Sequence, residues 1–224
     1  MKRLDRLISA FGRAQERLET PTGLVLVGGH PGEWEGEHPA QIASRLRIPK
    51  VFLAGWHTHE ELPEFFSAAE AVVLTSEREQ FGQVIVEGMA CGLPVVATRS
   101  PGPASIISDG ATGWLIEPDD QLALITALTE VVQDPIECQR RGELARVVVR
   151  ERYSWSAASE QLATLLTEVL TPSGDRPKSS QTTPNTRSDL TPIAPAAGSD
   201  WTSVTHSRPR PRRVLGPAHP SRAT

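Results

Sequence analysis

The chain has 224 residues, 38% of them hydrophobic, which is enough for one large or two small folded domains. Its charge is unevenly spread. Of its 23 Lys and Arg and 27 Asp and Glu residues, eight and three lie beyond Leu170, which leaves an acidic body with 15 and 24. Because binding to nucleic acid phosphates needs a basic surface, this body argues against nucleic acid as the main ligand.

The N-terminal residues resemble neither a secretory signal nor a membrane anchor. Residues 1–18 lack the apolar stretch of a signal peptide, and no apolar run in the chain approaches the roughly 20 residues of a transmembrane helix. The two cysteines, Cys91 and Cys138, indicate reduced thiols rather than a disulfide scaffold, with Cys91 expected to be buried. We therefore predict a cytoplasmic protein, with peripheral contact at the inner membrane surface as an alternative.

The first half of the chain alternates helical and strand patterns. Apolar residues at helical spacing predict a helix that begins near Leu4, a short helix around Ile42, and another around Phe65. Continuous apolar runs at 24–27 and 51–55 predict strands that are buried on both faces. A third strand is expected at 71–75.

The second half continues the same alternation. We expect a helix at about 81–91, a strand at 94–98, a short helix near Ile106, a strand at 113–116, and three helices around 122–132, 136–150 and 155–170. Alternating strands and helices predict a parallel sheet with helices on both faces. Residues 1–170 are thus expected to form one α/β domain with a Rossmann-like sheet.

Residues 171–224 have a different composition. This segment holds nine of the 19 prolines, is rich in Ser, Thr and Arg, and has no apolar periodicity. Such a segment buries too little apolar surface to offset the entropy lost on ordering, so we predict a disordered tail. Its basic run at 208–213 leaves contact with acidic lipid or RNA open, although a solvated tail without a specific partner is the favoured interpretation.

Residues 76–98 contain the candidate ligand-binding residues of the chain. Glu79 and Glu87 lie eight positions apart, on either side of the pair Phe81 and Gly82. The predicted helix start near Gly82 offers backbone N–H groups and the positive end of a helix dipole, both of which favour phosphate, and glycine allows close approach. Glu87 can accept hydrogen bonds from ribose hydroxyls, as acidic residues do in dinucleotide folds, and Glu79 from sugar hydroxyls.

This run resembles the EX7E signature of family 4 retaining glycosyltransferases, which have the GT-B architecture. Other segments follow the order and spacing of that family from about Lys2 to Leu170. These are FLAG (52–55), EELP (60–63), EQFG (79–82), EGMACGLPVVAT (87–98), DG and TG (109–110 and 112–113) and YSW (153–155).

The resemblance implies a role for each matching residue. Glu87 would bind the ribose of a nucleotide sugar, and Glu79 would contact the donor sugar and help to place its anomeric carbon. Backbone groups of Phe81 and Gly82 would bind the diphosphate. Lys2 would neutralise the diphosphate charge during catalysis, and backbone near Gly55 and Trp56 would meet the base. The family implies no metal ion and no other cofactor for this step.

Simpler interpretations of these residues remain open. Glu87 is alternatively a surface residue, Glu79 a carboxylate that stabilises a helix dipole, and Lys2 a mobile terminal charge. Gly88 interrupts the predicted helix at a cost of about 1 kcal/mol relative to Ala, for which close packing is our explanation. His57 and His59, with Glu60 and Glu61, resemble metal ligands, but we favour a loop and helix start there.

The chain also departs from the family pattern. The family has a strand ending in Gly-Arg just before the Lys, and this would be the central strand of a sheet of order 3-2-1-4-5-6. An N-terminal acceptor-binding domain would precede it. We therefore expect a fragment, or a start placed too late, with an acceptor domain or subunit as its partner. Ser105 stands where many members carry Glu.

The resemblance implies a transferase that moves a hexosyl group from a nucleotide-diphosphate sugar to an unknown acceptor hydroxyl with retention of configuration. This chain would be its donor-binding half. The alternative is a non-catalytic nucleotide-sugar-binding module, or one subunit of a split enzyme. An epimerase or phosphorylase of GT-B architecture is less favoured.

Overall fold

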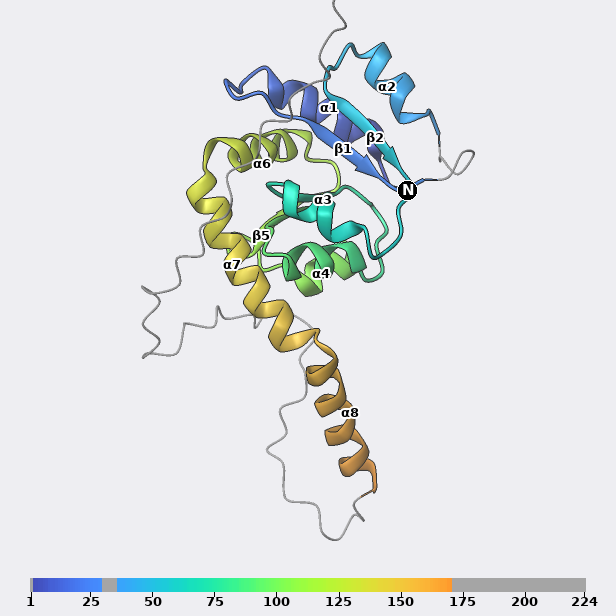
Figure 1. Cartoon of the computed structure of the whole chain (residues 1–224), viewed down its shortest axis with the longest axis vertical. Coiled ribbons are helices and arrows are strands. Elements are labelled where there is room, and N and C mark those ends of the chain that lie inside the picture. The colour runs from blue at the N-terminus through green and yellow to red at the C-terminus, as the bar shows by residue number, and fades with distance from the viewer. Residues whose placement is uncertain (1, 30–35, 171–224) are drawn as a thin grey trace, which may run out of the picture. The chain divides into compact units, whose positions relative to one another are not determined.

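The computed structural model describes residues 2–29 and 36–170, which form parallel strands flanked by helices (Figure 1). This confirms the predicted α/β class; the predicted disordered tail lies outside the described residues. The strands are β1 (Leu24–Val27), β2 (Val51–Gly55), β3 (Val72–Leu74), β4 (Val95–Thr98) and β5 (Gly113–Ile116). The helices are α1 (Leu4–Gln15), α2 (Pro39–Arg45), α3 (Leu62–Ala68), α4 (Gln83–Ala90), α5 (Pro101–Ile106), α6 (Gln121–Gln133), α7 (Pro135–Arg152) and α8 (Trp155–Leu170).

The strands form two parallel sheets rather than one. β1 pairs with β2, with Leu24 opposite Val51, and a second sheet has the order β3-β4-β5. Among the described residues β1 pairs only with β2, and β3 only with β4. The break lies between β1 and β3, where the resemblance implies a central strand.

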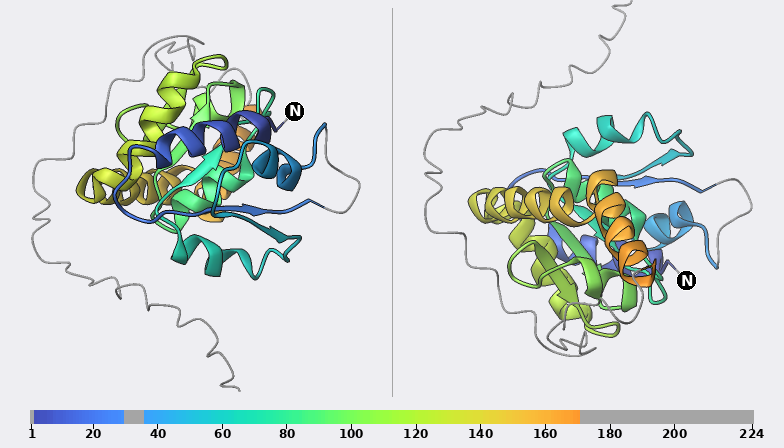
Figure 2. Two further views of the ribbon diagram at one scale, coloured as in Figure 1. Left: turned by 90° about the horizontal axis from the view of Figure 1, so that it is seen from above. Right: turned by 90° about the horizontal axis from the view of Figure 1, so that it is seen from below.

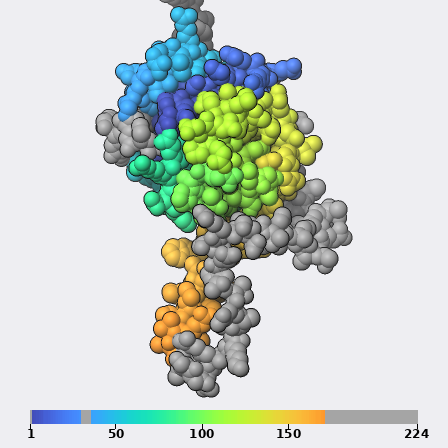
Figure 3. Space-filling view, turned by 180° about the vertical axis from the view of Figure 1, so that it is seen from behind, coloured from blue at the N-terminus to red at the C-terminus, as the bar shows by residue number. Residues whose placement is uncertain are grey.

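Helix α1 joins the two sheets through one hydrophobic core. Its apolar face is buried, with Ile8 fully covered, and α1 packs against α6 and α2 (Figures 2 and 3). The same core includes Leu24 of β1 and Val96 of β4, one from each sheet. The two sheets therefore share a helical layer although no described backbone pairing connects them.

A second core lies on the other face of β3 and β4, where Ile85 and Met89 of α4 are fully buried. Gly88 brings α4 close to β3, because a Cβ atom added there would lie 2.4 Å from Val72 Cγ2. Real Cβ contacts are never this short, so the expected close packing at Gly88 is confirmed. Helix α4, which carries Glu87, is thereby fixed against the sheet.

Two predictions about burial were wrong. Val25 and Phe52, which lie opposite each other in β1 and β2, are 50% and 56% exposed, so this sheet is not covered on both faces. α1 covers the face that carries Leu24 and Leu26, and an apolar run alone does not reveal whether a second layer exists. Cys91 is exposed instead of buried because it follows α4 at its C-terminal end.

Helix α8 buries none of its side chains in the described structure. Its exposed apolar residues include Leu162 and Leu165. None of the helices in the described residues has the length and apolar character needed to cross a membrane.

Candidate functional site

The start of α4 is built by Gly82, the N-cap residue. Gly82 has φ +90°, a left-handed conformation that favours glycine, and its carbonyl accepts a hydrogen bond from Ile85 N at 2.9 Å. No side chain caps this helix. Ile85 N is therefore engaged, whereas the N–H groups of Gln83 and Val84, which have no partner within a helix, are available to an anion here.

The loop before α4 is fixed by backbone packing against α5. Gly102 N donates to Glu79 O at 3.0 Å, and a Cβ on Gly102 would lie 2.4 Å from Phe81 O. The Phe81 ring makes an edge contact with Tyr153, with 6.1 Å between their centroids. The Phe81 side chain therefore packs on Tyr153, while its backbone leads into the helix start.

Lys2 and Glu79, which the sequence analysis assigned to catalysis, form an ion pair. Lys2 Nζ lies 3.6 Å from Glu79 Oε2, and the Glu79 side chain is largely buried. Because the Glu79 side chain also lies over Gly82, with its Cγ 3.5 Å from an added Cβ, this pair lies beside the start of α4.

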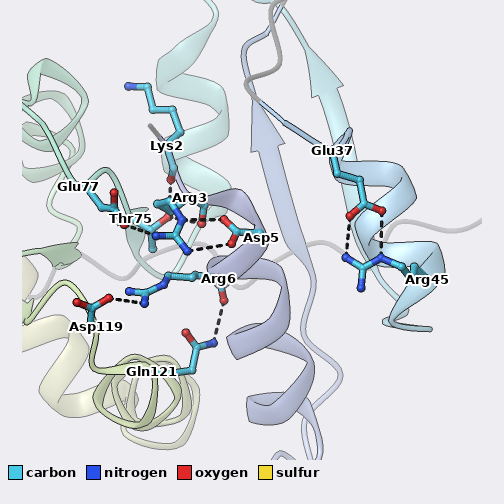
Figure 4. A network of polar contacts seen from close by, with 10 residues as sticks. All are labelled: Lys2, Arg3, Asp5, Arg6, Glu37, Arg45, Thr75, Glu77, Asp119 and Gln121. Atoms are coloured by element: carbon cyan, nitrogen blue, oxygen red, sulfur yellow. Dashed lines mark hydrogen bonds and ion pairs between the residues drawn. The ribbon is translucent and has the colours of Figure 1, made fainter.

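The backbone around Lys2 is held to the end of β3 (Figure 4). Thr75 Oγ1 donates to Lys2 O at 2.9 Å, and the guanidinium of Arg3 binds both Asp5 and Glu77. Arg3 itself has φ 50° and precedes α1. These contacts fix residues 2 and 3 next to the loop that carries Glu79, although more than 70 residues separate them in sequence.

Glu87 lies one helical turn beyond Gln83, the first residue of α4, and its side chain is 20% exposed. His59 Nδ1 lies 3.5 Å from Glu87 Oε1. His59 belongs to the loop after β2, which begins at Gly55 (φ +80°) and includes the exposed Trp56. The predicted ribose residue and the segment predicted to meet the base are thus connected by a side-chain contact.

The other polar side chains of this loop contact one another and the backbone. His57 lies between Glu61 Oε2, at 3.3 Å, and Ala54 O, at 3.2 Å. Within residues 2–29 and 36–170, no group of three or more His, Cys, Asp or Glu side chains could hold a metal ion. The expectation that no metal is required stays a prediction.

Two cavities lie away from these residues. One of about 620 Å³ is lined by α1 and the segments before β1 and β2, and one of about 360 Å³ by β5 and α6. Neither includes Lys2, Glu79 or Glu87.

Sequence reasoning proposed Lys2, Glu79 and Glu87 as site residues, and the structure places the first two in contact. The sequence reasoning did not identify Thr75, Arg3 or the contact of His59 with Glu87. A hydroxyl at the end of a predicted strand was a signal for Thr75, since ligands bind outside the carboxyl ends of parallel strands. Nothing in the sequence indicated that His59 reaches α4.

Residues 1–148 match the family model of glycosyl transferases group 1. The chain belongs to this family. It is 35% identical to a D-inositol 3-phosphate glycosyltransferase of Thermobispora bispora, over 69% of this chain and 37% of that protein. It is 29% identical to the N-acetyl-alpha-D-glucosaminyl L-malate synthase of Bacillus anthracis, over 76% of this chain and 43% of that protein.

Solved structures of similar fold support the same family. The sucrose-phosphate synthase of Thermosynechococcus elongatus aligns with a TM-score of 0.65 and 30% identity, over 75% of this chain and 42% of that one. HepE of Anabaena, in complex with UDP and glucose, aligns with a TM-score of 0.63 and 26% identity, over 75% and 45%. The chain spans less than half the length of these relatives.

Proposed function

We propose that this chain is the donor-binding half of a retaining glycosyltransferase, which moves a hexosyl group from a nucleotide-diphosphate sugar to an acceptor hydroxyl. The observation that carries the proposal is the ion pair of Lys2 with Glu79 beside the uncapped start of α4. A cation, a carboxylate able to accept hydrogen bonds from sugar hydroxyls and backbone N–H groups lie close together there, and a sugar diphosphate needs such groups. The complex of the related HepE with UDP and glucose supports this ligand class.

In the proposed reaction, most of the catalysis comes from stabilising the charge on the leaving group. The bond between the anomeric carbon and the diphosphate oxygen breaks, and its electron pair stays on the diphosphate. A bond to the acceptor oxygen forms on the same face of the sugar, and the acceptor proton ends on the diphosphate. Lys2 and the N–H groups at α4 would stabilise the charge that develops there, without a metal.

Glu79 and Glu87 would hold the two ends of the donor. Glu79, beside Lys2, would accept hydrogen bonds from the sugar, while Glu87, further along α4, would accept them from the ribose. Phe81 and Gly82 would provide backbone donors to the diphosphate, and Gly55 and Trp56 would contact the base. The acceptor would be bound by a further domain or subunit.

Titration of the full chain with UDP, GDP and ADP by calorimetry tests this proposal. We expect saturable binding of at least one of them, and Glu87→Ala should weaken it roughly 10- to 100-fold, the equivalent of losing one hydrogen bond to a charged group. Glu160→Ala, an exposed change on α8, is the matched control and should have no effect. Absence of binding, or equal binding by Glu87→Ala, would overturn the proposal.

A further inference from the structure

The loop between β2 and α3 contacts α4 through His59, a residue to which neither the family signature nor the proposed donor contacts assign a role. Its Nδ1 atom lies 3.5 Å from Glu87 Oε1. Among the described residues, His59 is the one Lys, Arg or His side chain with a nitrogen within 4.0 Å of the Glu87 carboxylate. The His59 side chain is 71% exposed and that of Glu87 is 20% exposed, so the contact lies at the surface of α4.

Hydrogen bonds join the residues on either side of His59 in this loop. The Glu61 carboxylate accepts hydrogen bonds from Thr58 N at 2.8 Å and from Thr58 Oγ1 at 3.1 Å, and it also meets His57 Nδ1. The His57 ring packs on Phe65 at 4.6 Å between centroids. These hydrogen bonds from Thr58 lower the pKa of Glu61 and join residues 57, 58 and 61 of the loop.

Such a contact favours the binding of ribose by a glutamate, because it reduces the side-chain freedom that is lost on binding. The terminal torsion of Glu is broad, so a free carboxylate samples many orientations and loses that freedom when it binds hydroxyls. An imidazole nitrogen next to one carboxylate oxygen restricts the torsion and still leaves acceptor sites for a ligand, since a carboxylate has about four. His59 contacts Oε1, which leaves Oε2 for hydroxyls.

We infer that His59 is a positioning residue that holds the Glu87 carboxylate for the ribose hydroxyls of the donor. Its place on the loop that begins at Gly55 and Trp56 couples recognition of the ribose to the segment that would meet the base. The inference rests on the proposed function, because it requires Glu87 to bind ribose. A residue that only stabilised the loop would change the affinity for every nucleotide by the same factor.

The test compares each ribonucleotide with its deoxy forms. Calorimetry gives the affinity of the full chain for UDP, GDP or ADP, whichever binds most tightly, and for the matching 2′-deoxy and 3′-deoxy nucleotides. We expect the wild-type chain to prefer the ribonucleotide, and Glu87→Ala to remove the preference. His59→Ala should reduce the preference by about threefold or more, as expected for coupled neighbours, and should have no further effect once Glu87 is Ala.

Two further variants distinguish a positioning role of His59 from an effect on folding. His59→Asn keeps a donor in the side chain and should restore part of the preference, whereas Glu60→Ala, an exposed change in the same loop, should leave it intact. Circular dichroism checks that each variant is folded. A full preference in His59→Ala, or an equal loss for ribose and deoxyribose forms, would overturn the inference while the proposed function stands. No nucleotide binding by the wild-type chain would overturn the proposed function and this inference with it.

Discussion

Because Gly88 has no side chain, α4, the helix that carries Glu87, packs closely against β3. A methyl group at this position would overlap Val72, which is buried in β3. Gly88→Ala should therefore destabilise the protein, because overpacking costs typically about 1–3 kcal/mol, which exceeds the roughly 1 kcal/mol gained in helix propensity. Urea unfolding measures the change. In a Val72→Ala background the penalty should disappear; an equal penalty in both backgrounds would rule out this contact as its cause.

Glu137, in the first turn of α7, lies between two guanidinium groups. Its carboxylate accepts hydrogen bonds from Arg140 Nε at 2.7 Å and Arg141 Nε at 2.8 Å, which lower its pKa from 4.5 to about 2. A carboxyl group with a lowered pKa in the folded state stabilises the fold above pH 4.5, and this contribution is lost as the pH falls toward 2.

Glu137→Gln should therefore lower stability at pH 7, by roughly 0.5–1 kcal/mol for a partly exposed pair. The difference from wild type should shrink as the pH falls below 4.5. Urea midpoints at pH 7, 5, 4 and 3 measure it, with Glu143→Gln on the same helix as a control for the loss of one charge. A difference that does not change with pH would contradict the assignment to Glu137.

The candidate site was predictable where its residues are close together in sequence. Glu79, Gly82 and Glu87 fall in one strand, loop and helix unit, so periodicity and helix geometry suffice to place them. The contacts of Thr75 with the backbone of Lys2, and of His59 with Glu87, join segments that are distant in sequence. Such contacts depend on how loops cross the sheet edge, which local patterns do not encode.

At the scale of elements, the order of helices and strands could be predicted because the helices have apolar residues at helical spacing and the strands are short continuous apolar runs. Thus Leu4, Leu7, Ile8 and Phe11 marked α1, and its apolar face is buried as that spacing implies. The environment of the elements was less predictable. The run that forms β1 is apolar at every position, yet Leu24 and Leu26 are buried while Val25 and Val27 are exposed. A continuous apolar run indicates a strand, whereas the burial of its two faces depends on which helices pack over the sheet.

At the scale of the whole molecule, the break between the sheets predicts uneven backbone protection. In β1, Leu24 N bonds to Lys50 O, so the N–H groups of Val25 and Val27 point away from β2, to an edge with no strand partner among the described residues. In β4, Val96 and Ala97 have strands on both sides. Hydrogen exchange followed by NMR should show faster exchange at Val25 and Val27 than at Val96 and Ala97. Equal protection would mean that another strand pairs with β1.

The contact between α1 and α6 also bears on how this protein is made. Residues 16–120 separate the two helices in the chain, although they pack side by side in the folded domain (Figure 3). During synthesis the apolar face of α1 leaves the ribosome long before its partner exists. Until α6 has been translated, the part of the apolar face of α1 that α6 covers stays exposed to solvent or to a chaperone, although α2 and β1 already exist. The nascent polypeptide is therefore most prone to aggregation before residue 133 has emerged.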